Sequence, residues 1–413
     1  YLDDAFPGKV FLNAFNPFIP GNENDSGIPA AFFEFEIHNP TADALDYYLA
    51  GTLRNPQPAN NLHSFHRDGN LHQLFFTSDK LPENVVGYGN LTLATDAPEV
   101  SCQEYAYRGS WFDTLEIYWQ DFTSPGGLNS RIYPPTEAGE RNYGTLAAHI
   151  HLSPGMSRKI RFVIAWHYPN CENYWSAESC QRAQQIGAKT VWKNYYAVLF
   201  KDSRHSASFA LQEWDRLFRE TLMFKDVLFA SSLPEAAIDA VSANLSVLKT
   251  PTVLRLEDGT LYGFEGCCTG SGCCEGSCTH VWNYTQAMPY LFPRLERSMR
   301  EADYRYNQRS DGGMRFRMIL PLELDAEKWW NFRACADGQF GGVMRIYREW
   351  KISGDTDWLR KLWKGVKKSI EFAWAPTNED HWDPDKSGVL TGRQHHTLDM
   401  ELYGPNAWLT GFY

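Results

Sequence analysis

The sequence lacks several features that would assign it to common functional classes. It has no run of about eighteen consecutive apolar residues, so no segment has the length of a membrane-spanning helix. Basic residues are outnumbered, and the net charge of −11 argues against a nucleic-acid surface and against electrostatic docking to an anionic membrane. Low-complexity bias is also missing, because 43% hydrophobic and 22% charged residues are typical of an ordinary globular protein.

An initiator methionine and a signal-peptide pattern are missing as well. The chain begins YLDDAFPGKVF, without basic, apolar and small-residue regions in succession. The default expectation is therefore a cytoplasmic protein, and we interpret the chain as an interior fragment of a longer one. Its 413 residues are too many for one compact core, so we expect two or three domains.

What the chain has in abundance is aromatic residues and, in its first half, the period-two alternation of β-strands. Residues 33–37, 146–152 and 160–168 alternate apolar and polar side chains. Turn sequences such as PGNENDSG and SPGMS separate these runs. Strands at this spacing, without helical patterns between them, predict an antiparallel β-sandwich over residues 1–205.

The periodicity becomes helical near residue 205. We predict a first helix around residues 211–222, and a second that Ser232 caps and that continues to Leu245. A third covers residues 279–303, a fourth ends at Gly354, and Asp355 caps a fifth. The fold class is thus multidomain, with a β-sandwich followed by an all-α domain over residues 206–413.

Two carboxylates stand out by their surroundings. Glu265 lies in YGFEG between two glycines, before a cysteine-dense loop, and Asp399 lies in HHTLDMELYGPN. Glycosidic-bond cleavage needs such a pair, one carboxylate to attack or to orient water and one to protonate the leaving oxygen. Each also has an ordinary alternative, which is a solvated loop glutamate for Glu265 and an Asx turn or helix cap for Asp399.

Three further residues are candidates for contact with a substrate. His280 and Trp282 begin the helix THVWNY, where Trp282 serves either as a platform for a sugar ring or as a lid on the helical core. Asp337 in CADGQFGG precedes another helix. An N-cap is its ordinary role, although capping a helix and lining a site are compatible.

Five of the nine cysteines fall within twelve residues, at 267, 268, 273, 274 and 278. Adjacent Cys-Cys pairs four residues apart match no standard zinc spacing. We therefore predict no metal site and no cofactor, and favour a local disulfide such as Cys267 to Cys278, or packed thiols, over a soft-metal site.

Several long segments resemble glycoside hydrolase family 116, which includes non-lysosomal glucosylceramidases, bacterial β-glucosidases and β-xylosidases. In the helical half these are YGFEG, CTHVWNYTQAMPYLFPRLERSMREAD, ADGQFGGVMRIYREWKISGDTDWLRKLW and HTLDMELYGP. Further upstream, RFVIAWHYPN and LFASSLPEAAIDAVSANLSVLKTPT are also similar to the family. The resemblance implies a sandwich followed by an (α/α)6 barrel, of which this chain would hold roughly the first half.

The resemblance also implies roles for individual residues in a retaining β-glycosidase. Glu265 would be the nucleophile and Asp399 the general acid and base, while Thr397 would contact the sugar or tune the acid. Asp337 would support them. The chain departs from the family where Thr279 replaces an aspartate and where Leu322-Glu323 replaces a sugar-contacting His-Asp, which points to a different sugar such as xylose.

The function predicted is therefore hydrolysis of a β-glucoside or glycolipid, with retention of configuration. Two alternatives use the same fold. One is a β-xylosidase or an inverting or phosphorolytic enzyme, and the other is a carbohydrate-binding protein without catalysis. Carboxyl groups about 5 Å apart favour retention and groups about 6.5 to 9.5 Å apart favour inversion.

Overall fold

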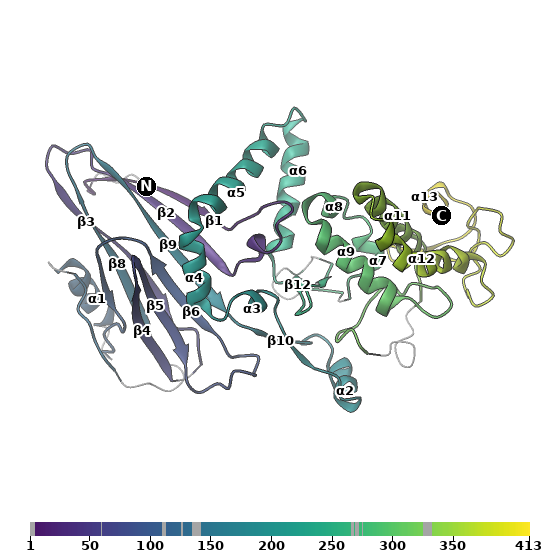
Figure 1. Ribbon diagram of the computed structural model, residues 1–413, viewed down its shortest axis with the longest axis horizontal. Helices are drawn as coiled ribbons and strands as arrows, with labels where there is room; N and C mark the ends of the chain where they lie inside the picture. Colours follow the sequence, from purple (N-terminus) through teal and green to yellow (C-terminus); the bar gives the residue numbers. More distant parts are fainter. Residues whose placement is uncertain are drawn as a thin grey trace. The chain divides into compact units, whose positions relative to one another are not determined.

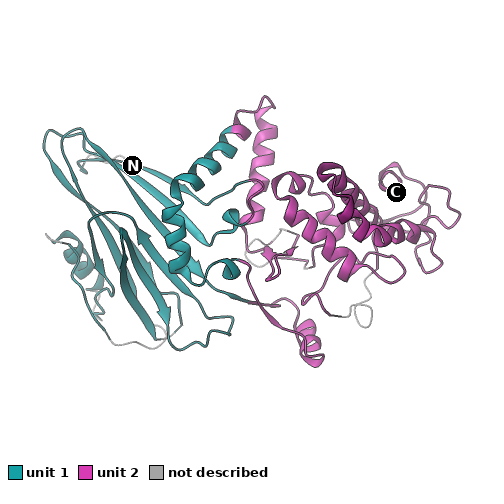
Figure 2. Ribbon diagram, viewed as in Figure 1, with its two compact units in different colours: residues 1–19, 24–170, 196–226 teal, residues 20–23, 171–195, 227–413 magenta. Residues whose placement is uncertain are grey.

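The chain forms two compact units, each described here by itself (Figures 1 and 2). The first comprises residues 1–19, 24–170 and 196–226, and the second comprises residues 20–23, 171–195 and 227–413. The structure is a computed structural model. It describes residues 5–58, 60–109, 113–124, 127–133, 142–265, 268, 272–274, 276–324 and 333–413.

Two antiparallel sheets build the first unit. The six-stranded sheet has the order β1-β2-β9-β6-β5-β4, and the three-stranded sheet has the order β3-β8-β7. Their strands are β1 (Lys9–Phe15), β2 (Ala30–His38), β3 (Leu45–Arg54), β4 (Asn61–Asp68), β5 (Leu71–Ser78), β6 (Asn90–Thr95), β7 (Val100–Gln103), β8 (Tyr143–Leu152) and β9 (Ser157–His167). The helical segments of this unit are η1 (Asp25–Gly27), α1 (Thr114–Thr123), α3 (Tyr196–Leu199), α4 (Ser203–Gln212) and most of α5 (Trp214–Phe229).

The alternation along β2 sorts its side chains between two cores. Phe33, Phe35 and Ile37 face the core between the two sheets, together with Phe162 of β9. Phe32 faces the opposite side. Because side chains along a strand point alternately to the two faces, one strand serves both cores. The predicted antiparallel sandwich is confirmed.

Helices α4 and α5 cover the outer face of the six-stranded sheet. Trp214, Ala210 and Leu217 are buried there against Phe32 and Val163. The ring of Trp214 lies 5.1 Å from that of Phe32. The predicted helix around residues 211–222 is thus two helices, and their apolar stripe packs on the sandwich.

The second unit is mainly helical. Its longer helices are α2 (Ala177–Gln185), α6 (Glu235–Leu245), α9 (Pro293–Ala302), α11 (Ala336–Ser353) and α12 (Thr356–Glu371). Short helical segments are η2 (Ser246–Lys249), α7 (Thr279–Trp282), α8 (Met288–Leu291), η3 (Asp303–Asn307), η4 (Phe372–Trp374) and α13 (Ala407–Phe412). Two-stranded sheets pair β10 (Asn170–Glu172) with β11 (Val191–Lys193), β12 (Val253–Arg255) with β13 (Leu261–Gly263), and β14 (Gln394–His396) with β15 (Met400–Leu402). The expectation of an all-α region was therefore too strict, and the (α/α)6 barrel stays a prediction.

Helix boundaries follow local chemistry more closely than the apolar pattern. Gly354 ends α11 in the left-handed conformation and Asp355 accepts a hydrogen bond from the Trp358 amide, as predicted. The single helix expected over residues 279–303 is wrong, because α8 and α9 each begin around a proline and are separate. Ser232 does not cap α6, which starts after Pro234.

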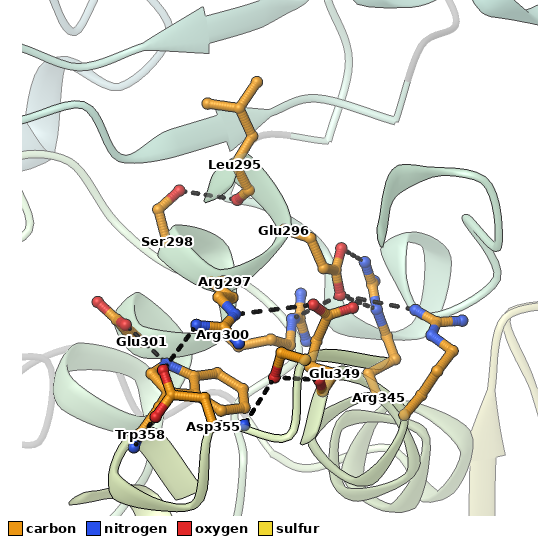
Figure 3. A network of polar contacts seen from close by, with 12 residues as sticks. Leu295, Glu296, Arg297, Ser298, Arg300, Glu301, Arg345, Glu349, Asp355 and Trp358 are labelled. Carbon is orange, nitrogen blue, oxygen red and sulfur yellow. Dashed lines mark hydrogen bonds and ion pairs between the residues drawn. The ribbon is translucent and has the colours of Figure 1, made fainter. Parts of the chain in front are cut away.

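Charged side chains are buried where α9, α11 and α12 meet (Figure 3). Glu296 accepts hydrogen bonds from Arg345 and lies 3.5 Å from Arg300. Arg297 reaches both Glu349, at 4.0 Å, and Asp355, at 3.1 Å. Glu296, Arg300 and Arg345 are buried, and removing one partner from a buried ion pair costs about 3 to 5 kcal/mol. These contacts therefore hold α9 against α11, whereas the link to α12 through Asp355 is partly exposed.

Within the part of the chain that the structure describes, no helix has both the length and the apolar character needed to cross a bilayer. This agrees with the sequence, in which no apolar run is long enough.

Candidate active site

Glu265 follows the short hairpin of β12 and β13. The amide of Phe264 donates a hydrogen bond to Thr252, and the Glu265 amide donates one to the carbonyl of Cys273 at 3.2 Å. The Glu265 side chain is 21% exposed. Its backbone is thus held on both sides of the residue, while its carboxylate is partly open.

Gly263 makes room for Trp282. A Cβ atom at residue 263 would lie 2.2 Å from Cζ2 of the indole. Trp282 is buried, and its Nε1 donates a hydrogen bond to the Phe264 carbonyl at 3.2 Å. The expectation of a sugar platform is therefore corrected: the ring packs beneath the Glu265 turn. The second flanking glycine, Gly266, lies outside the described residues.

The segment of residues 276–279 runs beside the Glu265 turn. The Ser277 amide donates to the Gly263 carbonyl at 2.9 Å. On its other side, the segment is bonded to Phe316 and Met318. Since both edges are tied, Cys278 and the following His280 are held in fixed positions near Glu265.

Two thiols contact the Glu265 carboxylate. Cys274 and Cys278 each form a side-chain hydrogen bond to it, and Arg317 in turn bonds to Cys278. Burial raises the pKa of Cys278, and the bond to Glu265 raises it further. At neutral pH this thiol is therefore protonated and donates to the carboxylate.

The predicted disulfide between Cys267 and Cys278 is wrong, because Cys278 is a free, buried thiol. Cys273 is disulfide-bonded instead. Cys267 itself lies outside the described residues.

His280 occupies the centre of the cluster. Its Nε2 lies 3.9 Å from Oε1 of Glu265. The imidazole is buried between the rings of Phe316, at 5.0 Å, and His395, at 6.0 Å. Burial lowers the pKa of His280, although the charges of Asp337, Glu265 and Asp399 oppose that effect. The ring is thus surrounded by three carboxylates.

Asp399 lies on a tight turn, as its sequence context predicts. The turn 397–399 joins β14 to β15, in which His396 pairs with Met400. Asp399 has φ of +53°, and its amide donates a hydrogen bond to His396 at 2.9 Å. A three-residue hairpin loop ends in this left-handed conformation, which Asp tolerates better than most residues. Leu398 is 64% exposed, so it does not surround the carboxyl with apolar material.

Asp337 anchors that turn. Its Oδ2 accepts hydrogen bonds from the Thr397 amide at 3.0 Å and from the Tyr284 hydroxyl at 2.9 Å, while Oδ1 accepts from Gly338. The residue is fully buried. It is not the N-cap of α11, which is Cys335. Bonded in this way, Asp337 is placed to position Thr397 and Asp399.

The two predicted catalytic carboxylates approach the same imidazole. One His280 ring nitrogen lies within 4.8 Å of a Glu265 oxygen and of Cys278, and a ring nitrogen lies within 4.8 Å of His395 and of an Asp399 oxygen. Both carboxylates also act electrostatically on Cys274. Residues 265 and 399, distant in sequence, are thus brought into one cluster.

Sequence reasoning missed several members of this cluster. His395 bonds to Glu401 at 3.2 Å, and Arg333 bonds to Glu401 at 2.9 Å. Arg317 was not considered at all. The only available signal was the charge density of QHHTLDME, in which two histidines and two acids lie within eight residues.

These features define a multidomain protein with an N-terminal antiparallel β-sandwich and a helical unit that carries a carboxylate cluster. A family model described as "beta-glucosidase 2, glycosyl-hydrolase family 116 N-term" matches residues 1–217. That match covers more than half of the chain, which therefore belongs to glycosyl-hydrolase family 116. The resemblance found in the sequence motifs is confirmed.

Among solved structures, the chain is similar to one from the human microbiome described as a candidate kojibiose phosphorylase. The identity is 12% and the TM-score is 0.40, over 94% of this chain and 45% of that one. The chain thus spans about half the length of this solved structure.

Proposed function

We propose that the full-length protein hydrolyses β-glycosides with retention of configuration, with Glu265 as nucleophile and Asp399 as general acid and base. The family membership of the chain supports a glycoside hydrolase. The observation that carries the assignment of residues is the approach of Glu265 and Asp399 to the same buried imidazole, His280.

In the first step, Glu265 attacks the anomeric carbon while Asp399 donates its proton to the departing glycosidic oxygen. The C–O bond to the aglycone breaks, and an ester bond forms between the sugar and Glu265. In the second step, Asp399 takes a proton from water, which displaces Glu265. The sugar leaves with its original configuration, and Asp399 is again protonated.

The surroundings of each carboxylate suit its proposed task. Glu265 accepts hydrogen bonds from two thiols, which hold its carboxylate in one direction, as attack on an anomeric carbon requires. Asp399 lies on an exposed turn, where water reaches it for the second step. Thr397, the residue whose amide is bonded to Asp337, contacts the sugar in this proposal.

A β-glucoside is the first substrate class, and a β-xyloside is the second. Leu322, which stands where the family has a sugar-contacting histidine, packs in an apolar cluster with Trp192, Tyr262 and Met318. It offers no polar contact to a sugar. A sugar without the hydroxymethyl group of glucose has fewer hydroxyl groups to contact and would lose the least binding free energy from such a change.

The stereochemistry of the product tests this proposal. The full-length protein is incubated with an aryl β-glucoside and, separately, an aryl β-xyloside, and the first-formed anomer is recorded by proton NMR. We expect the β-anomer. An α-anomer would favour inversion, turnover that requires phosphate would favour phosphorolysis, and sugar binding without turnover would favour a binding protein.

A further inference from the structure

Glu265 lies among groups that bind soft metal ions. Its carboxylate oxygen, the Sγ of Cys278 and a ring nitrogen of His280 all lie within 4.8 Å of one another. These are the three ligand types that zinc prefers, and three protein ligands with one open position form a common zinc site. The cysteine spacing alone did not predict this site, because only one of its three ligands is a cysteine and the other two are Glu265 and His280.

We propose that Glu265, Cys278 and His280 form a binding site for a divalent soft metal ion such as Zn²⁺, with the fourth position open, and that the bound ion withholds Glu265 from catalysis. The withholding of Glu265 rests on its proposed function as nucleophile, whereas the metal site does not.

The dimensions of the cluster are close to those of a metal site. Zinc bonds of about 2.0 to 2.3 Å in a tetrahedron place the ligand atoms about 3.3 to 3.8 Å apart. The Nε2 of His280 is already 3.9 Å from Oε1 of Glu265. Contraction from at most 4.8 Å therefore needs side-chain movements of about an ångström, without a change of backbone.

His280 has one ring nitrogen without a partner, and metal binding by the other nitrogen would assign its role. The side chain is 2% exposed, and its Nδ1 has no hydrogen-bond partner among the described residues. A buried polar atom without a partner costs about 1 to 3 kcal/mol. A metal ion on Nε2, which faces Glu265 at 3.9 Å, would leave the ring proton on Nδ1. A shift of the ring that brings Nδ1 to Asp337, whose carboxylate is within 4.8 Å of a ring nitrogen, would then remove that cost. A carboxylate behind a ligating histidine is a common arrangement at zinc sites.

The charges also fit an occupied site. The Cys278 thiol loses its proton to solvent when the metal binds, with no change of oxidation state. One carboxylate, one thiolate and a neutral imidazole then balance a divalent ion. The Cys278 thiolate also faces Arg317, which already bonds to Cys278.

The test compares metal binding in the full-length protein and three variants. Wild type, Cys278→Ser, Cys274→Ser and the control Cys180→Ser are titrated with Zn²⁺ in equilibrium dialysis, without added thiol. Cys180 is a free thiol on α2, bonded to the Asn173 carbonyl. We expect one zinc per chain, with affinity lowered more than about 100-fold by Cys278→Ser, lowered less by Cys274→Ser and unchanged by Cys180→Ser.

Cobalt substitution identifies the ligands. We expect Co²⁺ to give a tetrahedral visible spectrum and a thiolate-to-cobalt charge-transfer band that Cys278→Ser abolishes. No zinc bound, or zinc and cobalt spectra unaffected by Cys278→Ser, would overturn the site. A protein that binds one zinc at these ligands yet keeps full glycosidase activity would overturn the withholding of Glu265. A protein that binds the metal as expected but stays inactive after the metal has been removed would instead count against the proposed function alone.

Discussion

The surroundings of Glu265 and Asp399 differ although both carboxylates approach His280. Glu265 follows a hairpin whose backbone is bonded on both sides, and two thiols contact its carboxylate. Asp399 lies on an exposed turn in a left-handed conformation, and a buried aspartate one step away holds that turn. A nucleophile needs a constant charge and direction, whereas an acid that becomes a base must exchange protons with water. Each environment therefore suits the role proposed for its carboxylate.

The largest loss of turnover should come from substitution of Glu265. Glu265→Gln removes the nucleophile while preserving size, so turnover should fall on the order of 10⁴-fold or more, on all β-glycosides alike. Glu379→Gln, at an exposed loop position of the same unit, is the matched control and should retain activity. Steady-state kinetics on an aryl β-glucoside measure both, and substantial activity in Glu265→Gln would end the assignment.

Substitution of Asp399 should lower turnover by an amount that depends on the leaving group of the substrate. Asp399→Asn keeps a residue that tolerates positive φ, so the turn survives while the proton is lost. Turnover of substrates with poor leaving groups should fall about 10² to 10⁴-fold. Formation of the glycosyl-enzyme from substrates with activated leaving groups should change little. Pre-steady-state bursts separate these steps, and an equal loss of formation rate on both substrate types would remove Asp399 as the acid.

Asp337 should act through the Asp399 turn alone. Asp337→Asn weakens the bonds to Thr397 and Tyr284, and the misplaced turn should lower kcat by up to about 10²-fold. Its signature is the same dependence on leaving group as Asp399→Asn, with KM nearly constant. Tyr284→Phe removes one of the bonds and should show a weaker form of this pattern. A loss that is independent of the leaving group would make Asp337 a general stability residue instead.

The smallest effect concerns the packing beneath Glu265. Gly263→Ala places a Cβ 2.2 Å from the Trp282 ring, so the free energy of unfolding should fall by about 1 to 3 kcal/mol. Gly342→Ala is the control, since nothing lies within 4 Å of a Cβ there. This substitution in the interior of α11 should raise stability by about 0.5 to 1 kcal/mol. Urea denaturation compares the two variants, and equal stability would contradict the packing role of Gly263.

The sandwich was predictable from sequence because strand alternation reports burial directly. Phe33, Phe35 and Ile37 lie in the core between the sheets, as their period of two requires. The division of residues 279–303 into separate helices was not predicted. Pro289 and Pro293 divide this segment although its apolar pattern continues. Backbone restrictions prevailed over amphipathicity there.

In the candidate site, too, some features could be predicted from local sequence and others could not. Local context singled out Glu265 and Asp399, and the structure brings both residues to one cluster. The sequence left the role of Trp282 open, because the choice between platform and core depends on Gly263, which gives the ring its space. The contacts of Cys278 and Arg317 join segments about forty residues apart, and a single sequence carries no signal for such pairs.

The most direct measurement uses the full-length protein and a 2-deoxy-2-fluoro-β-glucoside with a good leaving group. The fluorine slows both steps, and the leaving group restores the first, so the glycosyl-enzyme accumulates. Intact mass and peptide mapping then locate the sugar. The account predicts one glycosyl adduct per chain, on the peptide that contains Glu265. An adduct on another carboxylate, or no adduct in an enzyme that turns over the unfluorinated glucoside, would contradict it.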